Sequence, residues 1–131
     1  MIDNIRHKSI RKKTASRIAA IQILYLHQYN DQSLFESISI YELYYKKFLL
    51  EKLEIKELDD NLLHILLKNF DKKKCSYDSI IQKHLSNNWK IERLGTNELN
   101  ILRLSVFELK FLKKYDYKTI INEYVSLFNN F

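Results

Sequence analysis

The residues that could do chemistry gather near the start of the chain, where cations precede a helical pattern that contains two tyrosines. The cations are Arg11, Lys12, Lys13 and Arg17, and the tyrosines are Tyr25 and Tyr29. Arginine binds phosphates in a bidentate manner, lysine supplies a point charge, and aromatic rings stack on unpaired bases. This combination is typical of contacts with single-stranded RNA. Packing of the tyrosines in the core or at its boundary is the alternative.

The distribution of charge indicates a polyanionic partner. The chain has 131 residues, of which 22 are basic and 16 acidic, so its formal net charge is +6. Residues 1–17 hold six basic residues and one acidic residue, and therefore contribute +5. We expect residues 1–13 to form a mobile basic arm that binds nucleic acid, with an anionic membrane as the second possibility. Lys72, Lys73 and Lys74 form a second candidate patch, for which a solvated loop is the alternative.

The sequence gives little support for metal binding, disulfide formation or catalysis. The histidines are far apart and share no metal-ligand spacing with Cys75; they are His7, His27, His64 and His84. Cys75 is the only cysteine, so no intramolecular disulfide can form, and a single glycine excludes a glycine-rich phosphate loop. We therefore expect no cofactor, no metal and no enzymatic activity. Because no apolar run reaches the ~20 residues that span a bilayer and no signal-peptide pattern is present, we expect a cytoplasmic protein without membrane association.

Periodicity predicts an all-α domain of about six helices over residues 14–131. One glycine and no proline argue against hairpin-rich β folds, and 46% hydrophobic residues argue against disorder. The predicted helices begin at capping residues, which are Thr14 or Ser16, Ser33, Asp59 or Asp60, Ser76, Thr96 and Asp116. The helix at Ser33 has Glu36 as its capping-box partner and runs to Phe48; a short strand over residues 37–40 is the alternative.

Residues 96–112 have the most apolar pattern and are predicted to form a central helix surrounded by other elements. Its apolar residues include Leu99, Ile101, Leu102, Leu104, Val106, Phe107, Leu109, Phe111 and Leu112. Gly95 is expected to allow a positive φ at the turn before this helix, with Thr96 as its N-cap. Arg103 and Glu108 are expected to pair with neighbouring polar groups or with backbone, because buried charges need partners.

Three motifs resemble the NusB family of bacterial transcription antitermination factors. They are RIAAIQILY at residues 17–25, WKIERL at 89–94 followed by ILRLSVFEL at 101–109, and INE at 121–123. They occur in the family's order and cover both ends of the chain, whereas residues 30–75 match only in character. The resemblance implies an all-α fold of two packed helical bundles.

The resemblance also implies a function. Family members bind the boxA element of nascent RNA together with NusE, a small-subunit ribosomal protein. The pair joins an antitermination complex on RNA polymerase in ribosomal RNA operons. Carried over to this chain, RNA contacts fall on Arg11, Lys12, Lys13, Arg17 and Tyr25. The interface with NusE falls on Tyr25 and Glu98.

The chain also departs from the family pattern. Relatives continue through a polar loop and one more helix, whereas this sequence stops at Phe131, so we expect the family's last helix to be missing and an apolar groove to be uncovered. A monomer and a homodimer both fit that expectation. Two alternatives stay open: a helical protein–protein adaptor without an RNA role, and an RNA-binding module like the NusB-like domain of ribosomal RNA methyltransferases.

Overall fold

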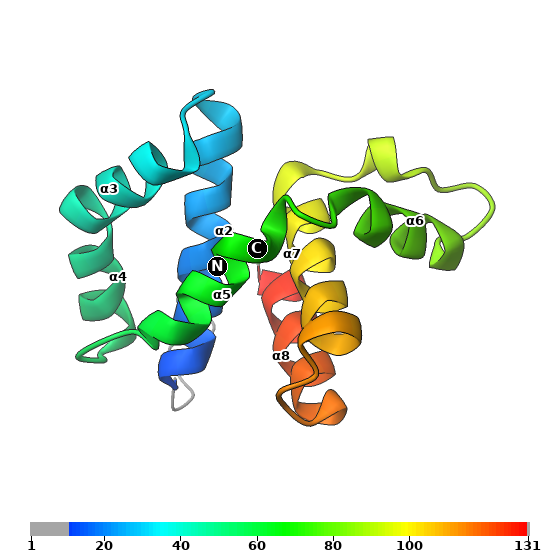
Figure 1. Ribbon diagram of the computed structural model, residues 1–131. Helices are drawn as coiled ribbons and strands as arrows, with labels where there is room; N and C mark the ends of the chain where they lie inside the picture. The colour runs from blue at the N-terminus through cyan, green and yellow to red at the C-terminus, as the bar shows by residue number, and fades with distance from the viewer. Residues whose placement is uncertain (1–10, 131) are drawn as a thin grey trace. The chain divides into compact units, whose positions relative to one another are not determined.

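The structure is a computed structural model that describes residues 11–130 as helices joined by short turns and loops. The helices, labelled as in Figure 1, are α2 (Lys12–Tyr29), α3 (Leu34–Tyr44), α4 (Lys46–Leu53), α5 (Asp60–Phe70), α6 (Lys74–His84), the 3-10 helix η1 (Ile91–Arg93), α7 (Thr96–Val106), the π-helix η2 (Phe107–Leu112) and α8 (Tyr117–Asn130). No strand occurs between residues 11 and 130. The all-α prediction is confirmed, and the alternative strand over residues 37–40 is wrong because these residues lie in α3.

The described helices divide into two compact units. The first contains residues 11–67 together with Asn130, and the second contains residues 68–129, so α5 contributes to both. Most of the predicted basic arm, residues 1–10, lies outside the described residues. Its last residues, Lys12 and Lys13, belong to α2. Across residues 11–130, no helix is both long enough and apolar enough to cross a bilayer.

Helix α2 is the best-buried element of the first unit. Seven of its apolar residues are at most 1% exposed, and they are Ala15, Ile18, Ala19, Ala20, Ile21, Ile23 and Leu24. The small alanines allow neighbouring backbones to approach, and α3 and α4 pack beside α2 (Figure 1). From α3, the buried Tyr41 hydroxyl donates a hydrogen bond to Oε1 of Gln22 on α2. Burial raises the pKa of Tyr41, so this hydroxyl keeps its proton and remains a donor.

Helix starts in the first unit agree only in part with the sequence. Ser33 caps α3 as predicted: its Oγ accepts from the Glu36 N–H at 3.1 Å and donates to the Glu36 carboxylate at 3.1 Å. Helix α2 begins at Lys12, with Arg11 at its N-cap and no side-chain cap, so neither Thr14 nor Ser16 is the cap.

The prediction of one continuous helix from Ser33 to Phe48 is also wrong. The chain breaks at Tyr45, which lies between α3 and α4 and has φ −121°. Helix α4 then ends at Leu53, and Glu54 after it adopts the left-handed conformation (φ 59°, ψ 43°) at a position where glycine is more common. The two short helices let the chain turn around α2 instead of running past it.

In the second unit, α6 packs against α7. Tyr77 of α6 is fully buried, donates a hydrogen bond to the backbone oxygen of Asn69 at 3.0 Å, and meets the rings of Phe107 and Phe111 edge-on. Helix α6 begins two residues before the predicted cap, with Lys73 at its N-cap, so the assignment of Ser76 as a cap is wrong.

The start of α7 differs from the prediction in a way that matters for Glu98. Gly95, not Thr96, is the N-cap, and its φ of −67° is an ordinary extended value, so the predicted positive φ is wrong. The Glu98 carboxylate accepts a hydrogen bond from the Gly95 N–H at 2.8 Å. A Cβ at residue 95 would lie 3.1 Å from this carboxylate oxygen, so the glycine leaves room for the cap.

The buried charges of the second unit are paired, as predicted. Arg103 donates two hydrogen bonds to the Asp78 carboxylate, from Nε at 2.7 Å and from a terminal nitrogen at 2.9 Å. The Tyr124 hydroxyl of α8 donates to the carboxylate of Glu108, which is 1% exposed. Asp116 caps α8 as predicted, since its Oδ2 accepts from the Thr119 N–H at 3.3 Å.

The predicted central helix over residues 96–112 is two elements. From Phe107 the backbone widens into a π-helix, which ends where Lys113 (φ 52°) donates to the Glu108 carbonyl. Leu102 and Leu109 are only half-buried and face an apolar groove of about 290 Å³ between α7, η2 and α8. Its other apolar residues include Ile121, Val125 and Phe128. Leu102 and Leu109, which the sequence pattern places on a buried helix, therefore line a groove instead.

Tyr124→Phe should lower the free energy of unfolding by about 1–3 kcal/mol, because it removes a donor from a buried carboxylate. Urea denaturation followed by circular dichroism measures the change. Tyr117→Phe is the matched control, since this tyrosine is 60% exposed and its loss of a hydroxyl should shift the free energy by less than about 0.5 kcal/mol. Equal effects of the two substitutions would contradict the role given to the Glu108–Tyr124 contact.

Candidate nucleic-acid interface

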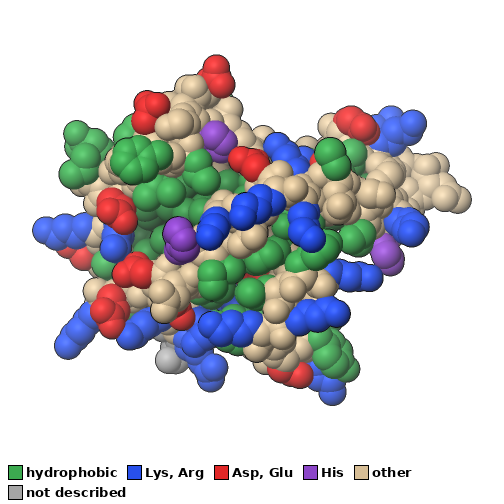
Figure 2. All heavy atoms as spheres, in the orientation of Figure 1, with side chains coloured by type: hydrophobic (Ala, Val, Ile, Leu, Met, Phe, Trp, Pro, Cys, Tyr) green, Lys and Arg blue, Asp and Glu red, His purple; other side chains and the backbone are tan. Residues whose placement is uncertain are grey.

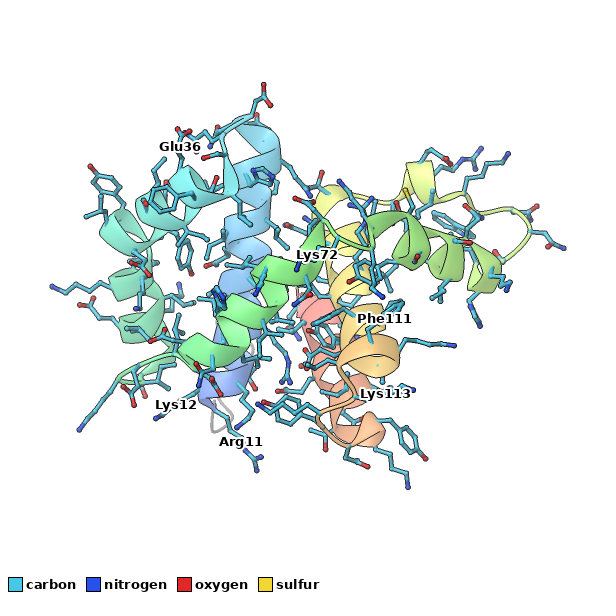
Figure 3. The ribbon with its side chains drawn as sticks, in the orientation of Figure 1. Arg11, Lys12, Glu36, Lys72, Phe111 and Lys113 are labelled. Carbon is cyan, nitrogen blue, oxygen red and sulfur yellow. The ribbon has the colours of Figure 1, made fainter. Side chains whose placement is uncertain are left out.

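Three cations lie together at the start of α2. Arg11 is exposed, and the side chains of Lys12 and Lys13 are 58% and 45% exposed. Figure 3 shows Arg11 and Lys12 at the same end of α2, directed away from the helix. Positive charge at a helix N-terminus opposes the helix dipole and carries a cost in helix stability. The first turn of α2 contains no acidic residue that would offset it.

Residues 57–59, which we call the acidic segment, lie just before α5 and face these cations. Lys12 Nζ lies 2.6 Å from Oε1 of Glu57, and Lys13 Nζ lies 3.9 Å from Oδ2 of Asp59. The hydrogen bond and the charge of Glu57 raise the pKa of Lys12 from its ordinary value of 10.5. The same contact lowers the pKa of Glu57 from 4.5. Both ions are exposed, so the pair orients side chains more than it stabilises the fold.

Ser16 fixes the acidic segment in place. It is fully buried, and its Oγ accepts from the Asp59 N–H at 2.7 Å and donates to the Asp59 carbonyl at 3.0 Å. The side chain of Asp59 in turn caps α5, since Oδ1 accepts from the Leu62 N–H at 3.0 Å. The prediction that Asp59 or Asp60 starts a helix is confirmed. One buried hydroxyl thus links the first turns of α2 to the start of α5.

The cations and the acidic segment enclose a hollow of about 720 Å³. It is lined by Arg11, Lys12, Lys13, Glu57, Leu58, Asp59, Asp60 and Asn61. Blue and red side chains lie close together on the lower left of Figure 2, over the part of the molecule where Figure 1 draws the start of α2. The hollow therefore offers cations, carboxylates and an amide within one open surface, which suits a ligand that carries both negative charge and hydrogen-bonding groups.

The other candidate residues of α2 lie in different surroundings. Tyr25 is 39% exposed and stacks on Tyr29, which is 75% exposed, with ring centroids 5.4 Å apart and an interplanar angle of 13°. This pair is an open aromatic surface on the same helix as the cations. Arg17 is only 2% exposed and has interaction partners within the chain. Arg11, Lys12 and Lys13 thus belong to one solvent-exposed surface, whereas Arg17 is buried and does not.

The remaining candidates belong to the second unit. Glu98 is exposed while it caps the Gly95 N–H, so its charge is available at the surface. In the Lys72–Lys74 run, Lys73 Nζ lies 4.5 Å from the centroid of the Phe111 ring and Lys74 Nζ lies 5.8 Å from that of Phe70, so two of the three lysines contact aromatic rings of the second unit. Figure 3 labels Lys72 and Phe111 in this region. Cys75 is exposed.

Metal binding has no support in the described part of the chain. Among residues 11–130, no three His, Cys, Asp or Glu side chains come together as a possible ligand set.

Sequence reasoning did not find Glu57, Asp60 and Asn61. The mixed charges of residues 51–60 predict a solvated loop or a frayed helix, followed by a helix start at Asp59 or Asp60. No local pattern links residues 57–61 to residues 11–13, more than 40 positions earlier. The link depends on the long-range contacts of Lys12 and Ser16.

The fold and this surface define a small all-helical protein with a basic, aromatic-bearing helix suited to a polyanion. The NusB family model matches residues 14–131. The transcription antitermination protein NusB of Clostridium botulinum (strain Loch Maree / Type A3) is 32% identical over 116 residues, which cover 86% of this chain and 82% of that protein. The same protein of Listeria monocytogenes serotype 4a is 28% identical over 116 residues, covering 88% and 80%. The chain belongs to the NusB family.

Solved structures agree with this assignment. A structure of the antitermination factors NusB and NusE in complex with double-stranded RNA has a TM-score of 0.67 and 30% identity, covering 92% of this chain and 83% of the matched chain. A structure of a plectonemic RNA supercoil contains a chain with a TM-score of 0.67 and 31% identity, covering 90% and 80%. The predicted NusB-like fold is thereby confirmed.

Lys12→Met should raise the pKa of Glu57 towards its ordinary 4.5, because the ammonium that favours the carboxylate is gone. NMR titration of the Glu57 side-chain carboxyl carbon measures this change. A lowered carboxyl pKa stabilises the fold above pH 4.5, and the contribution is lost as the pH falls through the lowered pKa. Lys47→Met, an exposed change on α4, is the control. An unchanged Glu57 titration in Lys12→Met would contradict the ion pair.

Proposed function

We propose that this protein is a transcription antitermination factor that binds boxA-type RNA together with NusE during ribosomal RNA transcription in the cytoplasm. It acts by binding and not by catalysis. The observation that carries the proposal is the group of exposed cations at the start of α2, in a chain that belongs to the NusB family. A similar NusB chain solved with NusE and double-stranded RNA supports the choice of partners.

RNA binding is proposed to begin with phosphates at Arg11, Lys12 and Lys13. Each phosphate that a cation neutralises releases condensed counterions, so affinity falls as salt rises. The Tyr25–Tyr29 pair supplies rings for base stacking further along the same helix. Arg17 is buried, so we propose that it contributes to RNA binding by supporting α2, and that direct phosphate contact requires its exposure.

Glu98 is proposed to present one carboxylate to NusE, with Tyr25 as a further contact. Glu98 is exposed, and its hydrogen bond to Gly95 holds the carboxylate at the entry of α7. A carboxylate fixed in this way loses little conformational entropy when it pairs with a cation of the partner. The RNA-bound pair would then join the antitermination complex on RNA polymerase.

A helical protein–protein adaptor is the second candidate function. The apolar groove between α7, η2 and α8 favours it, because exposed apolar surface of this kind marks interaction sites. The two functions differ in their requirement for RNA. Equal affinity for boxA RNA and a scrambled RNA, with and without NusE, would favour the adaptor.

Replacing Arg11, Lys12 and Lys13 together with glutamine should weaken RNA binding and flatten its dependence on salt. Each lost phosphate contact lowers the slope of log K against log salt by about 0.7 for a single strand. Fluorescence anisotropy with boxA RNA over a range of salt concentrations measures the slope.

The matched control for this variant replaces three exposed lysines of the second unit, Lys83, Lys110 and Lys118, with glutamine. It has the same net charge as the test variant. If both triple variants flatten the slope equally, binding depends on net charge alone and the proposed interface is wrong.

Glu98→Gln should weaken the NusE complex about fivefold, the effect of an ion pair near 1 kcal/mol. Glutamine can still accept the hydrogen bond from Gly95, so the helix cap survives and only the charge is lost. Isothermal titration calorimetry with NusE and RNA measures the affinity, and Glu92→Gln, on η1, is the control. Full affinity in Glu98→Gln would contradict the proposed contact with NusE.

A further inference from the structure

The hollow beside the cations contains two polar side chains without a hydrogen-bonding or ionic partner among residues 11–130. Glu57 is engaged by Lys12, and Asp59 caps α5 and holds Ser16. Asp60 and Asn61, the first two residues of α5, are exposed, and their side chains make no hydrogen bond or ion pair within the described part of the chain. Within residues 11–130, a carboxylate and an amide are thus not engaged by other side chains in the hollow that Arg11 and the two lysines line.

An available carboxylate is unexpected on a surface that binds phosphates, because it repels them. Cation–phosphate contacts set the position of an RNA strand but carry no sequence information, which has to come from groups that bind base edges. Single-stranded RNA exposes its Watson–Crick edges to such groups. Carboxylates accept from base N–H groups, and amides both donate and accept.

We propose that Asp60 and Asn61 form a base-recognition site for a guanine in single-stranded RNA. The inference rests on the proposed RNA-binding function and adds to it the residues that select the base. Guanine is the base with two adjacent donors, N1–H and N2–H, on its Watson–Crick edge, and these match the two oxygens of Asp60. The Asn61 amide donates to guanine O6. Arg11, Lys12 and Lys13 hold the flanking phosphates.

The geometry supports separate roles for the base-recognising side chains and the phosphate-binding cations. Asp59 and Ser16 fix the first turn of α5, so Asp60 and Asn61 project from a rigid helix start and not from a loose loop. A rigid helix start loses little entropy on binding, and Asp60 is also favoured there by the helix dipole. The hollow of about 720 Å³ is open and large enough to admit a nucleotide.

Substituting inosine for guanine tests the site, because inosine lacks only the N2 amino group. The probes are a uridine-rich single-stranded RNA with one guanine and the same RNA with inosine in its place. The unmodified protein should bind the guanine RNA about fivefold more tightly, as expected for one hydrogen bond of about 1 kcal/mol. Asp60→Asn should bind the two RNAs equally, because its amide cannot accept from both donors.

Glu36→Gln is the matched control. It makes the same carboxylate-to-amide change at the opposite end of the first unit (Figure 3), keeps the cap with Ser33, and should leave the guanine preference unchanged. Circular dichroism verifies that each variant is folded.

Two outcomes overturn the inference. Equal affinity of the unmodified protein for the two RNAs overturns the base-recognition site but leaves the proposed RNA-binding function intact. A guanine preference that survives in Asp60→Asn also overturns it; if the affinity for both RNAs then rises equally, Asp60 acts only by repulsion. Failure of the unmodified protein to bind either RNA, at low salt and with NusE present, contradicts the proposed function itself.

Discussion

The candidate interface depends on two hydrogen bonds between the buried Ser16 hydroxyl and the backbone of Asp59. They join residues 43 positions apart and satisfy the Asp59 N–H, while the Asp59 carbonyl also accepts from the Leu63 N–H of α5 at 3.1 Å. They bring the acidic segment to the cations and fix the first turn of α5. Without them, Glu57 and Lys12 would be held only by an exposed ion pair, which contributes little to stability.

Polar contacts have a similar role in the second unit. Arg103 with Asp78 connects α7 to α6, and Glu108 with Tyr124 connects η2 to α8. Apolar burial is non-directional, whereas a slip that separates a buried charge from its partner costs several kcal/mol, about 3–5 for a fully buried pair. These contacts therefore fix the registry of the helices, while apolar burial supplies most of the stability.

The sequence predicted what depends on local interactions. The Ser33 and Asp116 caps and the start of α5 follow from side chains bonding to N–H groups three residues on. Prediction failed where elements compete or contacts are distant. Ser76 is not a cap because α6 begins two residues earlier. The helix breaks at Tyr45, where the chain turns to pack around α2. The cations were found from composition, but Asp60 and Asn61 were not, because only folding brings them beside residues 11–13.

The first turn of α2 has a consequence for how sequence changes would act on this protein. Three cations occupy the positive end of a helix dipole, and nearby carboxylates relieve this only in part. The turn is locally frustrated: the residues that suit a polyanion are not those that suit the helix. Optimisation for stability alone would place Asp or Glu in this turn. A variant stabilised in that way would therefore bind a polyanion more weakly.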